Sequence, residues 1–340
     1  MIYMVKEISF AIISNKQQKG KQDKMKAKTM ALACAAAVCG AAFADEEAES
    51  VGWAYSPGEG VSFDDHPIVS GEASLAFDSK YLSYGLVDNK DPILTPSGSL
   101  TFFDWVSLEV EAIFDVTKYG RRAGYTSRAW EYTELHPGVS VGHTFSPDDY
   151  EWLPTAIDIS VGYQYEYHPN AKYKGGDGPD GQADDTQFWT VEFGLPDLWF
   201  EPVFQYERDV MRDNGTYLNL EIGHTFALID GEEEGEDPVL TFRPSVGQGF
   251  GNTMRVRSYL TRATTDGEGA PLDKSGLMDL CVKGELSWNI CEFCSLGGYV
   301  AYTDYVFDRR MREAARLYEA TGDWDHSWNF IAGLALTVSF

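Results

Sequence analysis

The sequence predicts an all-β protein, an antiparallel transmembrane β-barrel of about 12 strands of the outer-membrane type. In the last segment, Trp328 to Phe340, apolar residues alternate with small or polar ones up to a terminal Phe. Similar segments recur from Gly71 onward, each near the roughly 9 to 11 residues that a tilted membrane strand needs. No run reaches the roughly 18 apolar residues of a membrane helix. Taken alone, the last segment would also suit a buried strand of a soluble β-sandwich.

The chain ahead of residue 70 is expected to lie outside the barrel. Lys26 and Lys28 precede a short apolar run, and small residues occupy the cleavage positions Ala42-Phe43-Ala44, so residues 25–44 are interpreted as a secretory signal peptide. Residues 1–24 are either a mis-called start or an extended n-region. Residues 45–69 contain acids, Gly and Pro without a sustained period, which indicates a periplasmic tail before a barrel over residues 70–340.

The alternation predicts 12 barrel strands, an even number as single-chain bacterial barrels require. The clearest strand sets Ile157, Ile159 and Val161 opposite Asp158 and Ser160. The others begin at Gly71 and around Leu100, and continue as Val106–Val116, Trp130–Phe145, Gln187–Leu195, Leu198–Glu207, Tyr217–Phe226, Val239–Gly249, Leu280–Ile290, Phe293–Tyr305 and Trp328–Phe340.

Loop lengths predict the direction of these strands, because outer-membrane barrels have short periplasmic turns and long outer loops. The periplasmic turns are expected at residues 103–105, 195–197 and 291–294, and long outer loops alternate with them. The segment Thr253 to Leu260 is interpreted as loop or strand extension, because another membrane strand there would break the alternation. Asp308 to Ala320 has helical spacing and is expected to form a lid over the mouth.

Acids dominate the strand face that is expected to line the lumen. A wet lumen of this kind would have a negative potential and favour cations, although any hydrated barrel interior is polar even without a transport role. An intermediate strand number does not guarantee an open pore. The predicted lumen-lining residues are Glu72, Glu109, Glu111, Asp115, Asp158, Glu166, Glu192, Glu201, Glu221, Arg243, Lys283 and Glu285.

Two downward strands end in the same Gly-His-Thr-Phe sequence, at His143-Thr144-Phe145 and His224-Thr225-Phe226. Paired histidines can mark a metal or catalytic site, but here both lie on the outward parity at the periplasmic interface, which favours an aromatic girdle. Phe340 is expected at the same rim, as the signal that the barrel assembly machinery recognises. We therefore expect no metal and no cofactor.

Two kinds of outer-membrane hydrolase share this barrel architecture, and each needs a particular set of catalytic side chains. A phospholipase needs a Ser-His pair near the outer leaflet, because a hydroxyl is a weak nucleophile until a base takes its proton. An omptin-like protease needs Asp and His above the rim, where His168 and His326 are the candidates. Neither histidine lies in a recognisable motif, so no enzyme is expected.

The net charge of −26 becomes −31 once residues 1–44, with seven basic and two acidic residues, are removed. This excludes nucleic acid as a partner. The expected partners are outer-membrane lipid, lipopolysaccharide, the assembly machinery and small solutes, with the oligomeric state left open. Arginines that suit lipopolysaccharide phosphates or an anion-binding constriction are Arg121, Arg122, Arg128, Arg255, Arg257, Arg262, Arg309, Arg310, Arg312 and Arg316.

The mature chain keeps Cys281, Cys291 and Cys294, in a compartment that permits disulfides. Cys291 and Cys294 flank a tight turn, where either a turn-clamping disulfide or two plain thiols would fit.

The stretch from Ser74 to Gly85 reads as an alternating strand that runs into Tyr81-Leu82-Ser83-Tyr84-Gly85. It resembles the opening of the TorF family of porins, in which a Tyr-x-x-Arg-Gly-like segment follows the first strand and two strands joined by a tight turn come next. Tyr84 stands where that family has Arg. The resemblance covers about forty-five residues and implies a barrel and a pore, with no catalytic residues to carry over.

The sequence thus predicts a cell outer membrane protein that lets small hydrophilic solutes or ions diffuse passively, with a bias toward cations. The alternatives are a structural or adhesive barrel with a plugged lumen and, third, an outer-membrane hydrolase. The solute and the openness of the lumen are not determined by sequence.

Overall fold

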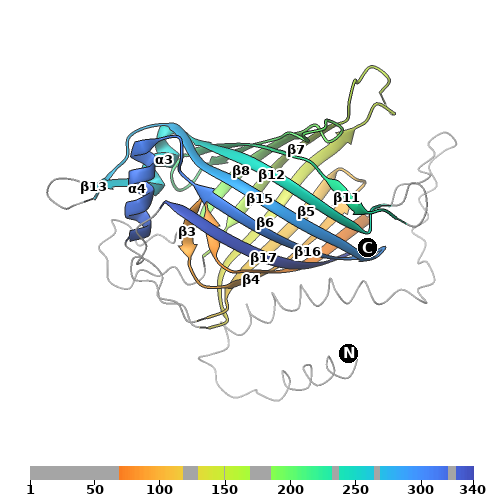
Figure 1. The fold of residues 1–340 in the computed structure, drawn as a ribbon, viewed down its shortest axis with the longest axis horizontal. Coiled ribbons are helices and arrows are strands. Elements are labelled where there is room, and N and C mark those ends of the chain that lie inside the picture. Colours follow the sequence, from red (N-terminus) through yellow and green to blue (C-terminus); the bar gives the residue numbers. More distant parts are fainter. Residues whose placement is uncertain are drawn as a thin grey trace, which may run out of the picture.

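The structure is a computed structural model that describes residues 69–117, 129–148, 150–168, 185–231, 237–263, 269–320 and 327–340. Within these ranges, 12 antiparallel strands close into one barrel, which confirms the predicted fold class (Figure 1). The sheet includes a short thirteenth strand, β11 (Phe226–Ile229), which pairs with β12 beyond the end of β10. The ring closes where β1 pairs with β17 and where β10 pairs with β12. The barrel strands are β1 (Val69–Asp78), β4 (Ile93–Phe102), β5 (Val106–Asp115), β6 (Glu131–Phe145), β7 (Ile157–Glu166), β8 (Thr186–Gly194), β9 (Val203–Asp209), β10 (Thr216–Gly223), β12 (Leu240–Gly251), β15 (Gly276–Cys291), β16 (Cys294–Asp304) and β17 (Trp328–Ser339).

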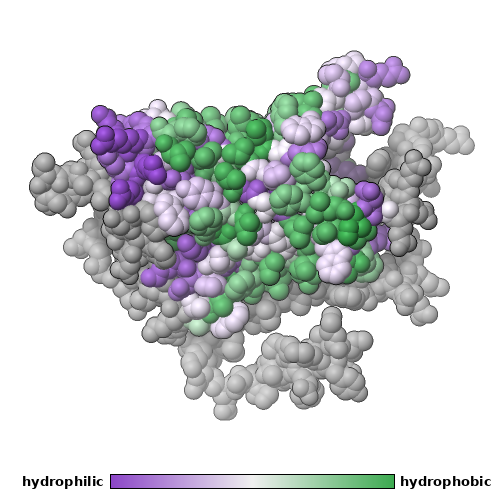
Figure 2. All heavy atoms as spheres, viewed as in Figure 1, coloured by the Kyte–Doolittle hydropathy of each residue, from purple (hydrophilic) through white to green (hydrophobic). Residues whose placement is uncertain are grey.

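The barrel wall is apolar on its outer surface. Large side chains that alternate with polar ones along each strand remain exposed, among them Leu75, Leu108, Val141, Ile159 and Leu334. Figure 2 shows hydrophobic side chains over much of the described wall, with hydrophilic ones gathered toward its ends. Exposed apolar surface on this scale is typical of contact with lipid rather than water. None of the helices in the described ranges is both long and apolar enough to cross a membrane.

The two ends of the barrel differ, as the loop lengths predicted. One end, called here the turn end, carries short connections such as Phe103-Asp104, whose φ angles of 54° and 59° are those of a tight hairpin turn. The same end carries the β15–β16 turn, where Cys291 lies opposite Cys294. Cys281, Cys291 and Cys294 are free thiols in the structure, so the turn is not clamped by a disulfide.

The predicted strand from Leu198 is wrong over its first five residues. Residues 195–202 form a turn in which the Leu198 N–H donates to the Leu195 carbonyl and the Glu201 N–H donates to the Leu198 carbonyl. Pro202 follows and has no N–H for a strand ladder, so β9 begins only at Val203. Glu201, predicted to lie on a strand, therefore lies in this turn with a φ of 35°.

The opposite end, called here the loop end, carries the helices α3 (Thr253–Tyr259) and α4 (Arg309–Ala320). It also carries the hairpins β2 (Tyr81–Ser83)–β3 (Leu86–Asn89) and β13 (Thr261–Ala263)–β14 (Gly269–Pro271). Helix α4 confirms the helical spacing seen in the sequence. Helix α3 corrects the interpretation of this segment as a loop or strand extension. It forms because the Asn252 side chain accepts a hydrogen bond from the Arg255 N–H and caps its first turn.

Helix α4 is also held at its start. The Asp308 carboxylate accepts hydrogen bonds from the N–H groups of Arg310 and Met311 and pairs with Lys274. Partial burial would raise the pKa of Asp308, but the hydrogen bond from Lys274 and those from the backbone outweigh it and lower the pKa. The apolar face of α4, formed by Met311, Ala314 and Ala315, is buried in a cluster that contains residues of β3, α3 and β15 and also Tyr305, which follows β16.

Several sequence interpretations lie outside the described residues. These are residues 1–68, with the proposed signal peptide and periplasmic tail, and also Arg121, Arg122, Arg128 and His326. Arg255 is described and is fully buried, so it is not available to lipopolysaccharide.

Phe340 is expected to be needed for assembly because its ring covers the seam between β1 and the end of β17. The Phe340 and Gly71 backbones exchange both hydrogen bonds, and a Cβ on Gly71 would lie 2.5 Å from Phe340 Cζ, so only glycine lets the ring lie there. In Phe340→Ser we expect the amount of heat-modifiable barrel in the outer membrane fraction to fall several-fold.

The matched control is Phe226→Ser, because Phe226 is 43% exposed and Phe340 is 44% exposed, both at the turn end. We expect the control to insert like the wild type. Equal insertion of the two variants would show that the seam contact has no special role.

Candidate functional site

The β2–β3 hairpin crosses the barrel interior at the loop end. The hairpin leaves β1, and its tip reaches β9, which lies six strands from β1 in either direction around the ring. There the Tyr84 hydroxyl donates a hydrogen bond to the Glu207 carboxylate of β9. Figure 1 shows β3 at the end of the barrel that also carries α3 and α4. The hairpin is therefore a strut across the lumen and not an external loop.

A buried arginine fixes the tip of this strut. Arg255 of α3 has no exposed surface, and its guanidinium lies 4.6 Å from the centre of the Tyr84 ring. Arg255 Nη2 donates to Glu207 Oε1 at 2.9 Å, and Nη1 lies 3.6 Å from Asp213 Oδ2. Burial, reinforced by Glu207, raises the pKa of the Tyr84 phenol well above its usual value, so this hydroxyl stays protonated as a donor.

The tip also makes hydrogen bonds through its backbone. The Tyr305 hydroxyl donates to the Tyr84 carbonyl at 2.6 Å, and Asn329 Nδ2 donates to the Gly85 carbonyl at 3.3 Å. Tyr84 and Gly85 have φ angles of 51° and 77°, in the left-handed region. A Cβ on Gly85 would lie 2.5 Å from Asp279 Cβ, so the turn needs glycine both for its φ and for its close approach to β15.

The base of the strut is anchored on the other side of the ring. Asn89 Nδ2 donates to Asp115 Oδ1 at 2.5 Å, and the Tyr81 hydroxyl donates to Glu134 Oε2 at 3.2 Å. Asp115 was predicted to line the lumen. It is buried, and its hydrogen bond from Asn89 helps to hold the hairpin inside the barrel.

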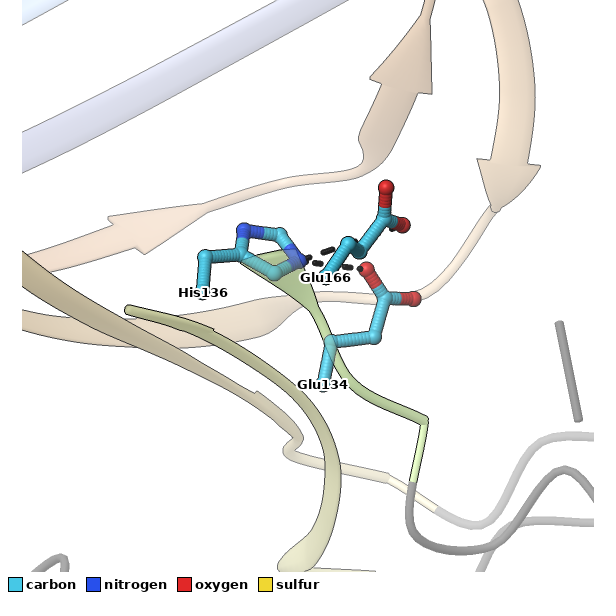
Figure 3. A group of neighbouring side chains, drawn as sticks. All are labelled: Glu134, His136 and Glu166. Carbon is cyan, nitrogen blue, oxygen red and sulfur yellow. Dashed lines mark ion pairs between the residues drawn. The ribbon is translucent and has the colours of Figure 1, made fainter. Parts of the chain in front are cut away.

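Beside this anchor, two glutamates and two histidines form a compact cluster inside the barrel, named here the Glu-His cluster: Glu134, His136, Glu166 and His168. Figure 3 shows three of these side chains, from β6 and β7, facing one another. His136 Nε2 lies 3.3 Å from Glu134 Oε2 and 3.9 Å from Glu166 Oε1. His168 Nε2 lies 3.1 Å from Glu166 Oε1 and 3.7 Å from Glu134 Oε1. All four side chains are largely buried, with between 4% and 18% of their surface exposed.

Glu166 was predicted as a lumen residue and His168 as an outer-loop candidate, whereas Glu134 and His136 were not predicted as site residues. The missed signal is a repeated Glu-x-His, at Glu134-Leu135-His136 and again at Glu166-Tyr167-His168. Two-residue spacing on a strand puts both members on one face. The Leu135–Tyr167 bridge then brings the two copies together in opposite directions.

Further into the barrel lies a cavity of 330 Å³ whose lining includes Glu109, Glu192 and Glu207. Two of its acids, Glu109 and Glu192, were predicted to line the lumen, and each accepts a hydrogen bond from the neighbouring strand, from Ser140 and Gln205 respectively. Glu207 and Tyr217, which hold the hairpin tip from the wall, line the same cavity. The cavity and the strut are therefore adjacent.

The predicted bases sit among acids on one side of the wall. Arg243 Nη1 donates to Glu221 Oε1 at 2.6 Å, and Arg243 Nε donates to Glu201 Oε2 at 3.2 Å. Lys283 Nζ lies 3.0 Å from Glu285 Oε2. Five predicted lumen residues are thus brought together, and each of the two basic side chains is paired with acids.

Two further predicted residues, Glu72 and Asp158, lie near the turn end, and Glu111 lies beside His136. Glu72 lines a second cavity of 580 Å³ together with Phe340, and Asp158 lies opposite Gly194 on β8. The two repeated histidines stack on tryptophans, His143 on Trp105 with ring centres 4.2 Å apart and His224 on Trp199 at 4.8 Å. These stacks fit the predicted aromatic girdle, far from the Glu-His cluster along the strands.

No family model matches this chain, and no curated protein matches it. Among solved structures, an outer membrane channel from Pseudomonas putida F1 is 9% identical, covers 84% of this chain and 99% of its own, and has a TM-score of 0.44. The outer membrane protein Omp33 of Acinetobacter baumannii is 10% identical, with coverages of 80% and 98% and a TM-score of 0.32. Salmonella typhi OmpF in complex with daunomycin is 9% identical, with coverages of 80% and 97% and a TM-score of 0.31. At such scores these likenesses carry no argument about function.

Removal of the buried guanidinium is expected to release the hairpin. In Arg255→Met, Glu207 and Asp213 lose their buried counter-charge, which typically costs about 3–5 kcal/mol. Lys80 and Lys90 flank the hairpin, so its release should speed tryptic cleavage at these two sites, read by mass spectrometry of the intact, folded barrel.

Arg257→Met is the control on the same helix, because Arg257 is 56% exposed and pairs only loosely with Asp273, at 3.5 Å. It should leave cleavage at Lys80 and Lys90 unchanged. Unchanged cleavage in Arg255→Met as well would mean that the arginine does not hold the hairpin.

Proposed function

We propose that this protein is an outer-membrane channel for passive diffusion of small hydrophilic solutes or ions, biased toward cations. The observation that carries the proposal is a cavity with glutamates in its lining, inside a closed barrel whose outer wall is apolar. An apolar wall suits lipid, and a polar lumen replaces part of the hydration that a solute loses on entry. The exposed loop end would then face outward and the turn end the periplasm.

The charge of the lumen supports the cation bias. Glu109 and Glu192 line the central cavity, where their hydrogen-bond partners are the neutral side chains of Ser140 and Gln205. Arg243 and Lys283 lie against Glu221 and Glu285 and so add little net positive charge. A low-dielectric wall focuses the remaining negative field into the lumen, which raises the local concentration of cations.

The structure also favours a second candidate, a structural or adhesive barrel with a plugged lumen. The strut spans the full ring, and its Leu86 belongs to the fully buried apolar cluster at the loop end. A hairpin held by buried charge on one side and by packing on the other restricts the mouth. The two candidates differ only in whether solute passes beside the strut.

A salt gradient across a planar bilayer tests the cation bias. The wild type should give discrete conductance steps with a cation-signed reversal potential, and Glu109→Gln with Glu192→Gln should move that potential toward zero. A carboxylate attracts a cation about 4 Å away in water by about 1 kcal/mol, which corresponds to a local cation concentration up to about fivefold higher. Asp148→Asn, in an exposed turn between β6 and β7, is the control and should have no effect. An anion-signed potential in the wild type would refute the charge argument.

Replacement of residues 81–89 by a short glycine linker tests the strut. If the hairpin narrows an open channel, the single-channel conductance should rise about twofold or more, since the strut crosses the whole lumen. If the wild type is silent and the variant conducts, the lumen is plugged in the native protein. Silence of both proteins, with normal insertion shown by heat-modifiability, would reject the channel.

A further inference from the structure

The Glu-His cluster has an arrangement that ion pairing alone does not require. The backbones of Leu135 and Tyr167 exchange two hydrogen bonds. This antiparallel pairing places Glu134 beside His168 and His136 beside Glu166. Glutamate and histidine therefore alternate at the four corners of a small square on the inner wall. The Nε2 atoms of both imidazoles point at the same two carboxylates.

The spacing of the donor atoms matches a metal site. Ligands about 2.0–2.1 Å from a tetrahedral Zn²⁺ lie about 3.3–3.4 Å from one another. The four measured separations between imidazole nitrogens and carboxylate oxygens, from 3.1 to 3.9 Å, bracket this value. Ligand atoms of Glu134, His136 and Glu166 lie within 4.8 Å of one another, and His168 Nε2 faces the same two carboxylates, so rotation of these side chains would bring the donors around one ion.

His136 is oriented as a metal-binding histidine would be. Its Nδ1 lies 3.2 Å from Glu111 Oε1, within hydrogen-bond distance. When Nδ1–H donates to that carboxylate, the Nε2 lone pair faces the cluster, the arrangement that outer-shell carboxylates impose on metal-bound histidines. The side chain is 9% exposed, and within the described part of the chain Nε2 makes no hydrogen bond of acceptable geometry.

We infer that Glu134, His136, Glu166 and His168 bind one first-row divalent transition cation of the Zn²⁺ type inside the barrel, with Glu111 as a positioning residue. The inference stands on the cluster alone and does not require that the barrel conducts. The bound cation would offset the negative charge that two glutamates bring into a largely buried place.

The donor set decides the class of ion. Two imidazoles and two carboxylates suit Zn²⁺ and its neighbours, whereas Ca²⁺ takes six to eight oxygen ligands and Mg²⁺ keeps several waters. Cu⁺ prefers thiolate or thioether donors, and the cluster contains neither.

The test is titration of the full-length, detergent-solubilised barrel, with any affinity tag removed, by ZnCl₂ in a calorimeter and by CoCl₂ in a visible spectrometer. We expect one ion per barrel, retained in a large excess of Ca²⁺, and a visible Co²⁺ spectrum with the intense bands of tetrahedral coordination. Neither readout depends on channel activity, so failure of the channel proposal would leave both results unchanged.

His136→Gln should weaken Zn²⁺ binding by at least about 100-fold and abolish the Co²⁺ bands, since loss of even an outer-shell partner costs about 10–100-fold. Glu111→Gln should weaken binding by about 10–100-fold and shift the bands without abolishing them. The matched control is His143→Gln, because His143 stacks on Trp105 at the turn end and should leave both readouts unchanged. Heat-modifiability confirms that each variant is folded.

Three outcomes would overturn the inference. The first is no saturable binding by the wild type, in which case the cluster is an ion-pair network around protonated imidazoles. The second is equal binding by His136→Gln, which places the ion on other acids. The third is displacement of Zn²⁺ by millimolar Ca²⁺, which would indicate a site built from oxygen ligands alone.

Discussion

The structure depends on one constraint. Because the outer surface of the wall is apolar, every backbone N–H and C=O in the wall must make its hydrogen bond within the wall. The sheet meets it by pairing β1 with β17 and β10 with β12, so that no edge remains in the ring. Closure forces the side chains to alternate between the outer surface and the lumen. The acidic side chains that face the lumen must then be stabilised by water, by bases or by hydrogen-bond donors. Their partners differ from one part of the lumen to another.

At the loop end the inward-facing acids are stabilised by a buried network of charged side chains. Arg255 is taken wholly out of water, which is unfavourable unless acids compensate it, and Glu207 and Asp213 do so from the wall and from a loop. The same Glu207 accepts from Tyr84, so the arginine, the wall and the hairpin tip stabilise one another. The strut is therefore specified by a few polar contacts, and the apolar cluster around Leu86 and Met311 fills the space on its other side.

The strands of the barrel wall could be predicted from the sequence, but the contacts inside the barrel could not. Period two predicted the 12 strands and their direction, because alternation and loop length are local properties of the chain. It gave the wrong start for β9, since Trp199 and Phe200 fit a membrane strand while the turn hydrogen bonds and Pro202 decide otherwise. The strut could not be predicted, because Tyr84 and Glu207 are 123 residues apart in the sequence. The alternation indicates which face of the wall a side chain lies on, but it does not indicate which segment crosses the lumen and contacts that side chain. The repeated Glu-x-His was readable, and its meaning depended on the register between β6 and β7.

The strut joins two unlike halves of the loop end. One half, around α3, α4 and the start of β15, is packed with apolar side chains, and the other, around β6 and β7, carries the Glu-His cluster. Tyr81 at the base of the hairpin donates to Glu134 Oε2, the oxygen that also faces His136 Nε2. A cation that took this oxygen as a ligand would compete with Tyr81 for it, because a carboxylate oxygen drawn toward a metal is a weaker acceptor. Occupancy of the cluster and the position of the hairpin base would therefore be linked through a single carboxylate, and by reciprocity a movement of the hairpin would change the affinity of the cluster for a cation.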